Sequence, residues 1–120
     1  MASIRHPGGP IIYSIEKGVY RTPGGIPSYQ LVNNIIKIYG GLPKYRIDGN
    51  RISIAGGLPI LELSNSSIKI YGGLTIATIV ENKIKPQGGP IAYILEGKLT
   101  KLELLGLIAI LFDPNKNKGW

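Results

Sequence analysis

The sequence repeats with a constant period of sixteen residues, and each repeat begins with two adjacent glycines. With the first glycine counted as position 1, position 8 is Ile or Leu in all six units, and position 14 is Lys or Arg in five of them. The pairs are Gly8 and Gly9, Gly24 and Gly25, Gly40 and Gly41, Gly56 and Gly57, Gly72 and Gly73, and Gly88 and Gly89. Such a period predicts that every unit is one supersecondary element packed against its neighbours.

Within a unit, apolar residues alternate with polar ones in two short runs, which is typical of half-buried β-strands. Turn-forming sequences such as Asp48–Arg51 and Ser64–Ser67 separate the two runs. We therefore predict one β-hairpin per unit, in which position 8 faces 13, position 7 faces 14 and position 6 faces 15. This register places Glu62 opposite Lys69. The glycine pairs are predicted to be structural turns that connect one hairpin to the next.

The two ends of the chain carry half-units. Ile4 and Arg5 match positions 13 and 14, whereas Leu107–Phe112 match positions 4 to 9 of a seventh unit. The expectation is an all-β closed ring of about seven two-stranded hairpins, propeller-like or flower-like, in which the N- and C-terminal strands pair and no sheet edge stays open.

A two-sheet β-solenoid is the alternative to the ring. It would stack the position-14 cations about 4.8 Å apart, whereas a ring of hairpins separates them by ~9–10 Å, which favours the ring. The lumen of a wide barrel lined by Ile and Tyr cannot stay empty, because apolar surface is driven out of water. Either the hairpins radiate like propeller blades or another chain covers the apolar face, and the sequence leaves both possibilities open.

Composition and length indicate one globular domain at residues 1–112 with a polar tail at 113–120. The chain has no cysteine and one histidine, so we predict no disulfide, no metal site and no cofactor. The longest apolar run, Leu104–Phe112, is nine residues long, far below the ~20 of a transmembrane helix. Without a recognisable secretory signal, the chain is expected to be a cytoplasmic or particle-associated soluble protein.

The segments Gly89–Ile94 (GPIAYI) and Gly9–Tyr13 (GPIIY) resemble the Gly-x-Pro-x-Tyr-x-Ile hairpin of the β-flower proteins. The resemblance extends over nearly the whole chain, but the chain has more repeats than the members of that family. It implies a fold of radiating β-hairpins and brings no activity and no catalytic residues.

The acidic residues do not form a recognisable catalytic motif. Four of them lie at or beside the predicted turns, spread around the ring, so nothing brings a pair together for acid–base chemistry. They are Glu16, Asp48, Glu62, Glu81, Glu96, Glu103 and Asp113. No phosphate-binding or nucleophile motif occurs either, and we predict that the protein is not an enzyme.

The basic residues supply the best clue to binding, because the chain has a net charge of +7. The position-14 cations would form a circle on the polar face, with two tyrosines of position 16 near them. The candidate anion- or glycan-binding residues are Arg5, Arg21, Lys37, Lys69, Lys85, Lys101, Tyr39 and Tyr71. Equally, such lysines serve to keep exposed strands soluble. The tyrosines of position 6 share the phase of the apolar residues and are expected to pack in the core; they are Tyr13, Tyr29, Tyr45 and Tyr93.

Two hypotheses for the function follow. The first is a non-enzymatic, repeat-built β module that serves as a structural or assembly element, with a homo-oligomer or another assembly partner. The second is a multivalent binder of anionic or glycan ligands, such as nucleic acid or an acidic polysaccharide, whose binding would fall steeply with salt.

Overall fold

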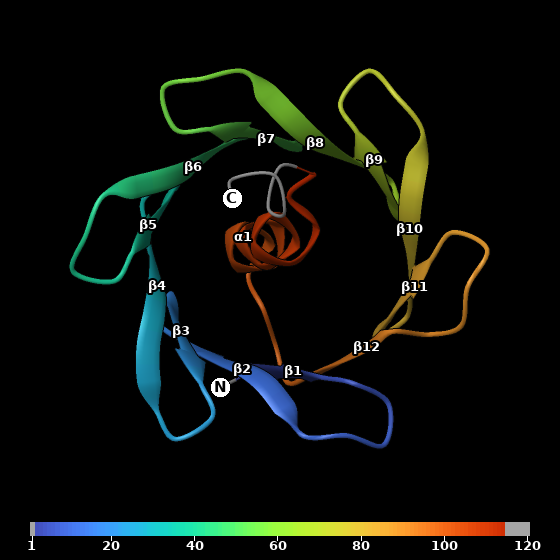
Figure 1. The fold of residues 1–120 in the computed structure, drawn as a ribbon, viewed down its shortest axis with the longest axis horizontal. Coiled ribbons are helices and arrows are strands. Elements are labelled where there is room, and N and C mark those ends of the chain that lie inside the picture. The colour runs from blue at the N-terminus through green and yellow to red at the C-terminus, as the bar shows by residue number, and fades with distance from the viewer. Residues whose placement is uncertain (1, 115–120) are drawn as a thin grey trace.

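The computed structural model describes residues 2–114 and shows a closed antiparallel β-barrel around a helix (Figure 1). Each strand is hydrogen-bonded to the strands before and after it in the chain, and the first strand is bonded to the last. The strands are β1 (Ala2–Arg5), β2 (Ile11–Glu16), β3 (Val19–Thr22), β4 (Ile26–Val32), β5 (Ile35–Ile38), β6 (Pro43–Asp48), β7 (Arg51–Ile54), β8 (Pro59–Ser64), β9 (Ser67–Ile70), β10 (Thr75–Val80), β11 (Lys83–Pro86) and β12 (Tyr93–Glu96). They are followed by the helix α1 (Lys101–Phe112).

The hairpins have the register that the repeat predicts. In the first unit Ile15 pairs with Tyr20, which are positions 8 and 13. In the fourth unit Glu62 pairs with Lys69, which are positions 7 and 14. Each tight turn needs residues with positive φ, and Gly18, at 77°, supplies one in the first hairpin. The prediction of one β-hairpin per sixteen residues is therefore confirmed for the five hairpins from β2–β3 to β10–β11.

The barrel closes because β1 pairs with β12 on one side and with β2 on the other. Ile4 faces Leu95 and Arg5 faces Ile94, so β1 takes the register of the second strand that the sixth unit lacks. The prediction of a closed ring in which the first and last strands pair is confirmed, but the last strand is β12 and not the expected Leu107–Phe112. The expectation of about seven hairpins is wrong in number, because the N-terminal half-unit completes the sixth hairpin and leaves no seventh.

Residues 107–112 are helical, so the prediction that they form the last strand is wrong. Thr100 and Lys101, expected in the second strand of the sixth unit, instead begin α1. A capping box starts the helix: the Thr100 hydroxyl accepts from the Glu103 amide at 3.1 Å, and the Glu103 carboxylate accepts from the Thr100 amide at 3.0 Å. The place beside β12 that a returning strand would take is already filled by β1, so the C-terminal segment enters the barrel instead.

The helix fills the lumen and covers the inner apolar face of the barrel. The position-13 side chains are fully buried around it; these are Ile4, Tyr20, Ile36, Ile52, Ile68 and Ile84. From the helix, Leu105, Leu107, Ile108, Ala109 and Ile110 are buried against them. The inner apolar face of the barrel is thus covered by the helix of the same chain.

Hydrogen bonds fix the helix at both ends of the barrel. Near its start, the Glu103 carboxylate accepts from the Gly18 amide at 2.9 Å, and the Tyr20 hydroxyl donates to the Glu103 carbonyl at 2.6 Å. Beyond its end, the Tyr45 hydroxyl donates to an Asp113 carboxylate oxygen at 2.7 Å. The helix therefore runs from the end that carries the two-residue turns to the end that carries the glycine connections.

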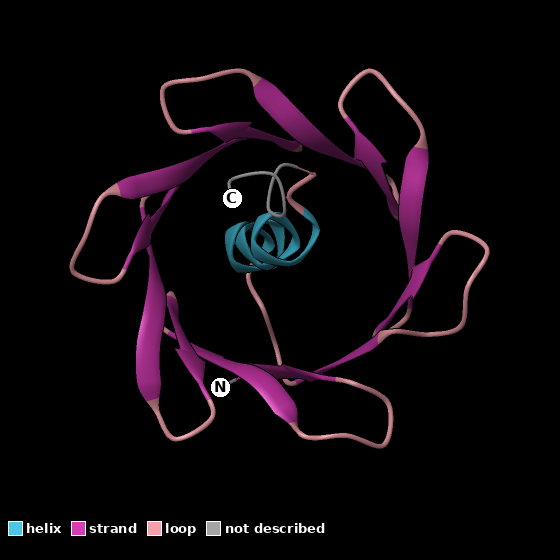
Figure 2. Ribbon diagram, viewed as in Figure 1, coloured by secondary structure: helices cyan, strands magenta, loops and turns pink. Residues whose placement is uncertain are grey.

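The two ends of the barrel differ in shape. The connections with the glycine pairs splay away from the barrel axis, as Figure 2 shows, whereas the opposite end has two-residue turns. The first glycine of every pair has a positive φ, between 67° and 95°, which an L-residue rarely adopts. An up-and-down barrel places all these connections at one end, which we call the wide end.

Candidate functional site

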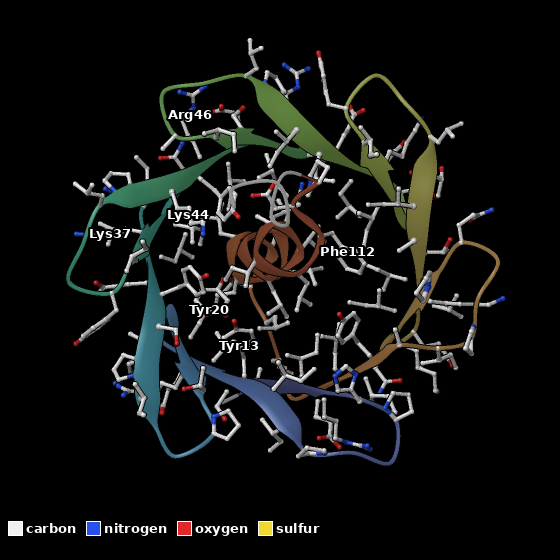
Figure 3. The ribbon with its side chains drawn as sticks, viewed as in Figure 1. Tyr13, Tyr20, Lys37, Lys44, Arg46 and Phe112 are labelled. Atoms are coloured by element: carbon white, nitrogen blue, oxygen red, sulfur yellow. The ribbon has the colours of Figure 1, made fainter. Side chains whose placement is uncertain are left out.

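The position-14 cations lie on the outer wall of the barrel. Their neighbours at position 13 point into the lumen, so position 14 points outward, and Lys37 can be followed there in Figure 3. The outer-wall cations are Arg5, Arg21, Lys37, Lys69 and Lys85. Lys101 does not belong to this group, because it is the first residue of α1. The fold therefore spreads five of the six predicted cations around the circumference and does not bring them to one point.

Two of these cations face an acid. The Arg5 guanidinium lies 3.3 Å from the Glu96 carboxylate, and Lys69 is paired with Glu62 across β8 and β9. Arg21, by contrast, is paired with Ser14. Lys37 and Lys85 are paired with Gln30 and Thr78. Arg21, Lys37 and Lys85 are therefore the position-14 cations on the wall that have no acid opposite them in their hairpin.

The two position-16 tyrosines lie on connections that are not neighbours. Tyr39 follows β5 and Tyr71 follows β9, and the equivalent residue between them is Ala55. Both rings are exposed, and the Arg51 guanidinium lies 4.8 Å from the centroid of the Tyr71 ring. Among residues 2–114, the cation that lies over a position-16 ring is therefore Arg51, which is not one of the position-14 residues.

Inside the wide end, the position-6 tyrosines form an aromatic lining next to the helix. The Tyr13 and Tyr29 rings are 6.4 Å apart, and the Lys44 ammonium lies 5.8 Å from the ring centroids of both Tyr29 and Tyr45. Figure 3 labels Tyr13 and Lys44. Burial, and then the neighbouring Tyr29, raise the pKa of Tyr13. Lys44 thus occupies the space between these rings that a cationic ligand would need, and the lining serves the core.

Exposed apolar side chains lie on four consecutive glycine connections of the wide end. They belong to the position-3 residues that directly follow four glycine pairs, and their exposed fractions run from 64% to 81%: Ile26, Leu42, Leu58 and Leu74. Three of these residues are held on tight, hydrogen-bonded connections; for example, the Leu42 carbonyl accepts from the Ile38 amide at 3.0 Å. We call these four side chains the apolar rim.

Sequence reasoning missed this rim, although the signal was present. Position 3 carries Ile26, Leu42, Leu58 and Leu74 in four consecutive units, which was visible from the repeat alone. Only the knowledge that the glycine connections splay outward shows that these side chains do not join the core. The rim is therefore a surface feature that depends on the three-dimensional course of the connections.

A cleft of about 410 Å³ lies on the outer face of the first hairpin. It is bounded by the connection before β2 and by the connection between β3 and β4. Its walls are Pro10, Ile11, Ser14, Arg21, Thr22, Pro23, Gly24 and Gly25. The walls are mostly apolar, and Arg21 brings the one charged side chain among them. We call it the first-hairpin cleft.

The acidic side chains that make hydrogen bonds or ion pairs take part in structure. Glu103 caps the helix, Asp113 accepts from Tyr45, and Asp48 lies 2.8 Å from Arg46. Between residues 2 and 114 there is no group of three or more His, Asp or Glu side chains placed to hold a metal ion. These three acids are therefore held in place by partners on the barrel wall or the helix.

Comparisons with known proteins bring no relative. No family model, no curated protein and no solved structure matches the chain. The resemblance to the β-flower proteins therefore stays a prediction. Over residues 2–114, the one helix is too short to cross a membrane.

Proposed function

We propose that this protein is a non-enzymatic assembly module that associates with further copies of itself through the apolar rim. The observation that carries the proposal is the repetition of a largely exposed Ile or Leu at position 3 in four consecutive units, all at one end of the barrel. Scattered apolar side chains are ordinary on protein surfaces, whereas a set that recurs with the repeat and shares one end marks an interaction surface.

The closed barrel supports a contact made by side chains. Every strand has a partner on both sides, so the barrel offers no free edge to which another strand could be added. Association therefore depends on burial of the rim. Each rim side chain contributes about 1.5–3 kcal/mol when fully buried. Four of them together balance a cost of association of ~4–15 kcal/mol, so we expect a reversible, concentration-dependent contact.

The net charge of +7 opposes self-association and gives the proposal a distinctive dependence on salt. Salt screens the repulsion between protomers, so association through the rim strengthens as the salt concentration rises. Binding of a polyanion has the opposite dependence, because counterions are released on binding. We expect the protein to associate in the cytoplasm or at the surface of a particle, the locations predicted from the sequence.

The test is sedimentation velocity over a range of protein concentrations, at about 0.05 M and about 0.5 M salt. We expect the weight-average mass to rise with protein concentration, and to rise more at the higher salt. The triple variant Leu42→Ser, Leu58→Ser, Leu74→Ser is expected to remain a monomer. A wild-type protein that stays monomeric under all these conditions contradicts the proposal.

A matched control removes apolar side chains from the other end of the barrel. Val32 and Val80 are exposed beside two-residue turns, away from the rim. We expect the double variant Val32→Ser, Val80→Ser to associate as the wild type does. Equal loss of association in this control contradicts a specific role for the rim.

The second candidate function, a multivalent binder of acidic polymers or glycans, is supported by the outer-wall cations that face no acid. Arg21, Lys37 and Lys85 are such residues. Because they point outward around the circumference, a ligand would have to wrap around the barrel to reach all three. Retention on a heparin column at low salt, lost in a Lys37→Gln, Lys85→Gln variant, would favour this function, and no retention would dismiss it.

A further inference from the structure

We propose that the first-hairpin cleft binds a small organic carboxylate with a compact apolar body. The cleft has the volume of a small-molecule site, and its composition matches the usual combination of apolar walls with few polar groups. This inference is independent of the rim, because none of the four rim side chains lines the cleft.

Arg21 is positioned to recognise the carboxylate. One guanidinium nitrogen donates to the Gly25 carbonyl at 3.1 Å, which holds the side chain against the wall of the cleft. Across the described chain Arg21 has no acidic partner, in contrast to Arg5 with Glu96. The remaining N–H groups of the planar guanidinium match the two oxygens of a carboxylate.

Ser14 supplies a second polar contact. It is paired directly with Arg21 on the neighbouring strand, and both side chains lie on the outer face, where paired Cβ atoms are about 4.5–5.5 Å apart. The Thr22 hydroxyl is already used, since it donates to the Ile26 carbonyl at 3.3 Å. Among residues 2–114 the Ser14 hydroxyl makes no hydrogen bond, so it is available to one carboxylate oxygen.

The cleft lies where the chain departs from its own repeat. Gly25 is the second glycine of its pair and has a φ of +84°, whereas the second glycines of the other pairs do not have a positive φ. As a result β4 begins at Ile26, at position 3, whereas β6, β8 and β10 begin at position 4. Pro10 and Pro23 stiffen the two sides of the cleft, because proline fixes its own φ. A preformed cleft loses less entropy when it binds a ligand.

The test is a titration followed by amide chemical shifts in the ¹H–¹⁵N spectrum, with 4-phenylbutyrate as the probe and its neutral amide as the matched compound. We expect the carboxylate to shift the amides of Ser14, Arg21, Gly24 and Gly25, and the neutral amide to bind about tenfold or more weakly. Absence of shifts around the cleft with the carboxylate, or equal affinity for the neutral compound, overturns the proposal.

Variants distinguish binding in the cleft from non-specific attraction of an anion to a basic protein. Arg21→Gln is expected to weaken binding of 4-phenylbutyrate by about tenfold or more, because a charge-assisted contact is lost. Lys37→Gln removes the same charge at the equivalent position of the next hairpin, and we expect unchanged affinity. Ser14→Leu fills the cleft without any change of charge and is expected to abolish the shifts. If Lys37→Gln weakens binding as much as Arg21→Gln, the attraction is non-specific and the cleft is not a site.

Discussion

Tyr20 and Tyr45 connect the barrel wall to the C-terminal segment inside the barrel through their hydroxyl groups. Tyr20 donates to the Glu103 carbonyl and Tyr45 to the Asp113 carboxylate. Burial raises the pKa of Tyr20 well above its usual value, and the charge of Glu103 raises it further. Burial raises the pKa of Tyr45 as well, with the hydrogen bond and the charge of Asp113 adding to the effect. Both hydroxyl groups therefore stay protonated in the folded protein.

These raised pKa values predict a loss of stability in alkaline solution. An unfolded tyrosine ionises near pH ~10, whereas the folded protein resists ionisation of Tyr20 and Tyr45. The contribution of each group is fully present below pH ~10 and is lost as the pH rises toward the folded pKa, at about 1.4 kcal/mol per pH unit. Urea unfolding between about pH 9 and pH 11 measures this slope.

Phenylalanine variants give the control for that slope. Tyr20→Phe costs about 1 kcal/mol at neutral pH through its lost hydrogen bond, and the decline of its unfolding free energy above pH ~10 should be shallower. Tyr39→Phe, at an exposed ring, should decline as the wild type does. Equal slopes in all three proteins would contradict the role given to Tyr20.

Gly106 packs tightly between the helix and the barrel wall. A Cβ added there would collide with the Ile36 side chain and with the Tyr20 hydroxyl, and both of these side chains are fully buried. Gly106→Ala normally favours a helix by up to ~1 kcal/mol. Here we expect it to destabilise the protein by about 1–3 kcal/mol, because the packed side chains cannot move aside. Chemical denaturation measures the difference, and a more stable variant would contradict this packing.

At the level of the elements, the hairpins could be predicted and the helix could not. The hairpins follow from period-two alternation and from turn residues, which are local signals. The helix is buried on every side, so residues such as Leu107, Ile108 and Ile110 show no polar face with helical spacing. A short apolar run of this kind cannot be assigned to helix or strand by periodicity.

One local signal did indicate the helix. Thr100 and Glu103 have the spacing of a capping box before an apolar run, and the seventh unit would have required Leu104 and Leu105 where every other unit has glycines. Of the candidate site, the outward direction of the position-14 cations follows from the hairpin register. The first-hairpin cleft could not be predicted, because it depends on the positive φ of Gly25.

At the level of the whole molecule, one short strand keeps the sheet without an edge. β1 has four residues and pairs with both β2 and β12, and its Ala2 and Ile4 side chains are buried. Removal of residues 2–5 would leave β2 and β12 each with an unpaired side. Such edges pair with other chains, so we expect the truncated protein to aggregate, as gel filtration and light scattering can measure.

Two substitutions in the same strand refine this prediction. Ile4→Ala should cost about 2–5 kcal/mol of unfolding free energy, because it leaves a cavity in the core beside β1. Arg5→Ala, on the outer side of the same strand, loses only a partly exposed ion pair with Glu96 and should cost less than ~1 kcal/mol. A truncated protein that remains a monomer of full stability would show that the pairing of β1 with β2 and β12 is dispensable.

The pairing of β1 with β12 also bears on the order in which the barrel folds. Ser3 meets Glu96, one of the most distant strand pairings in the chain, so we expect closure to come late in folding. The helix follows β12 in the chain, so we expect it to be enclosed as the barrel closes. Contacts between residues so far apart in the sequence slow folding, so the final sealing of the barrel around its helix is expected to govern the folding rate.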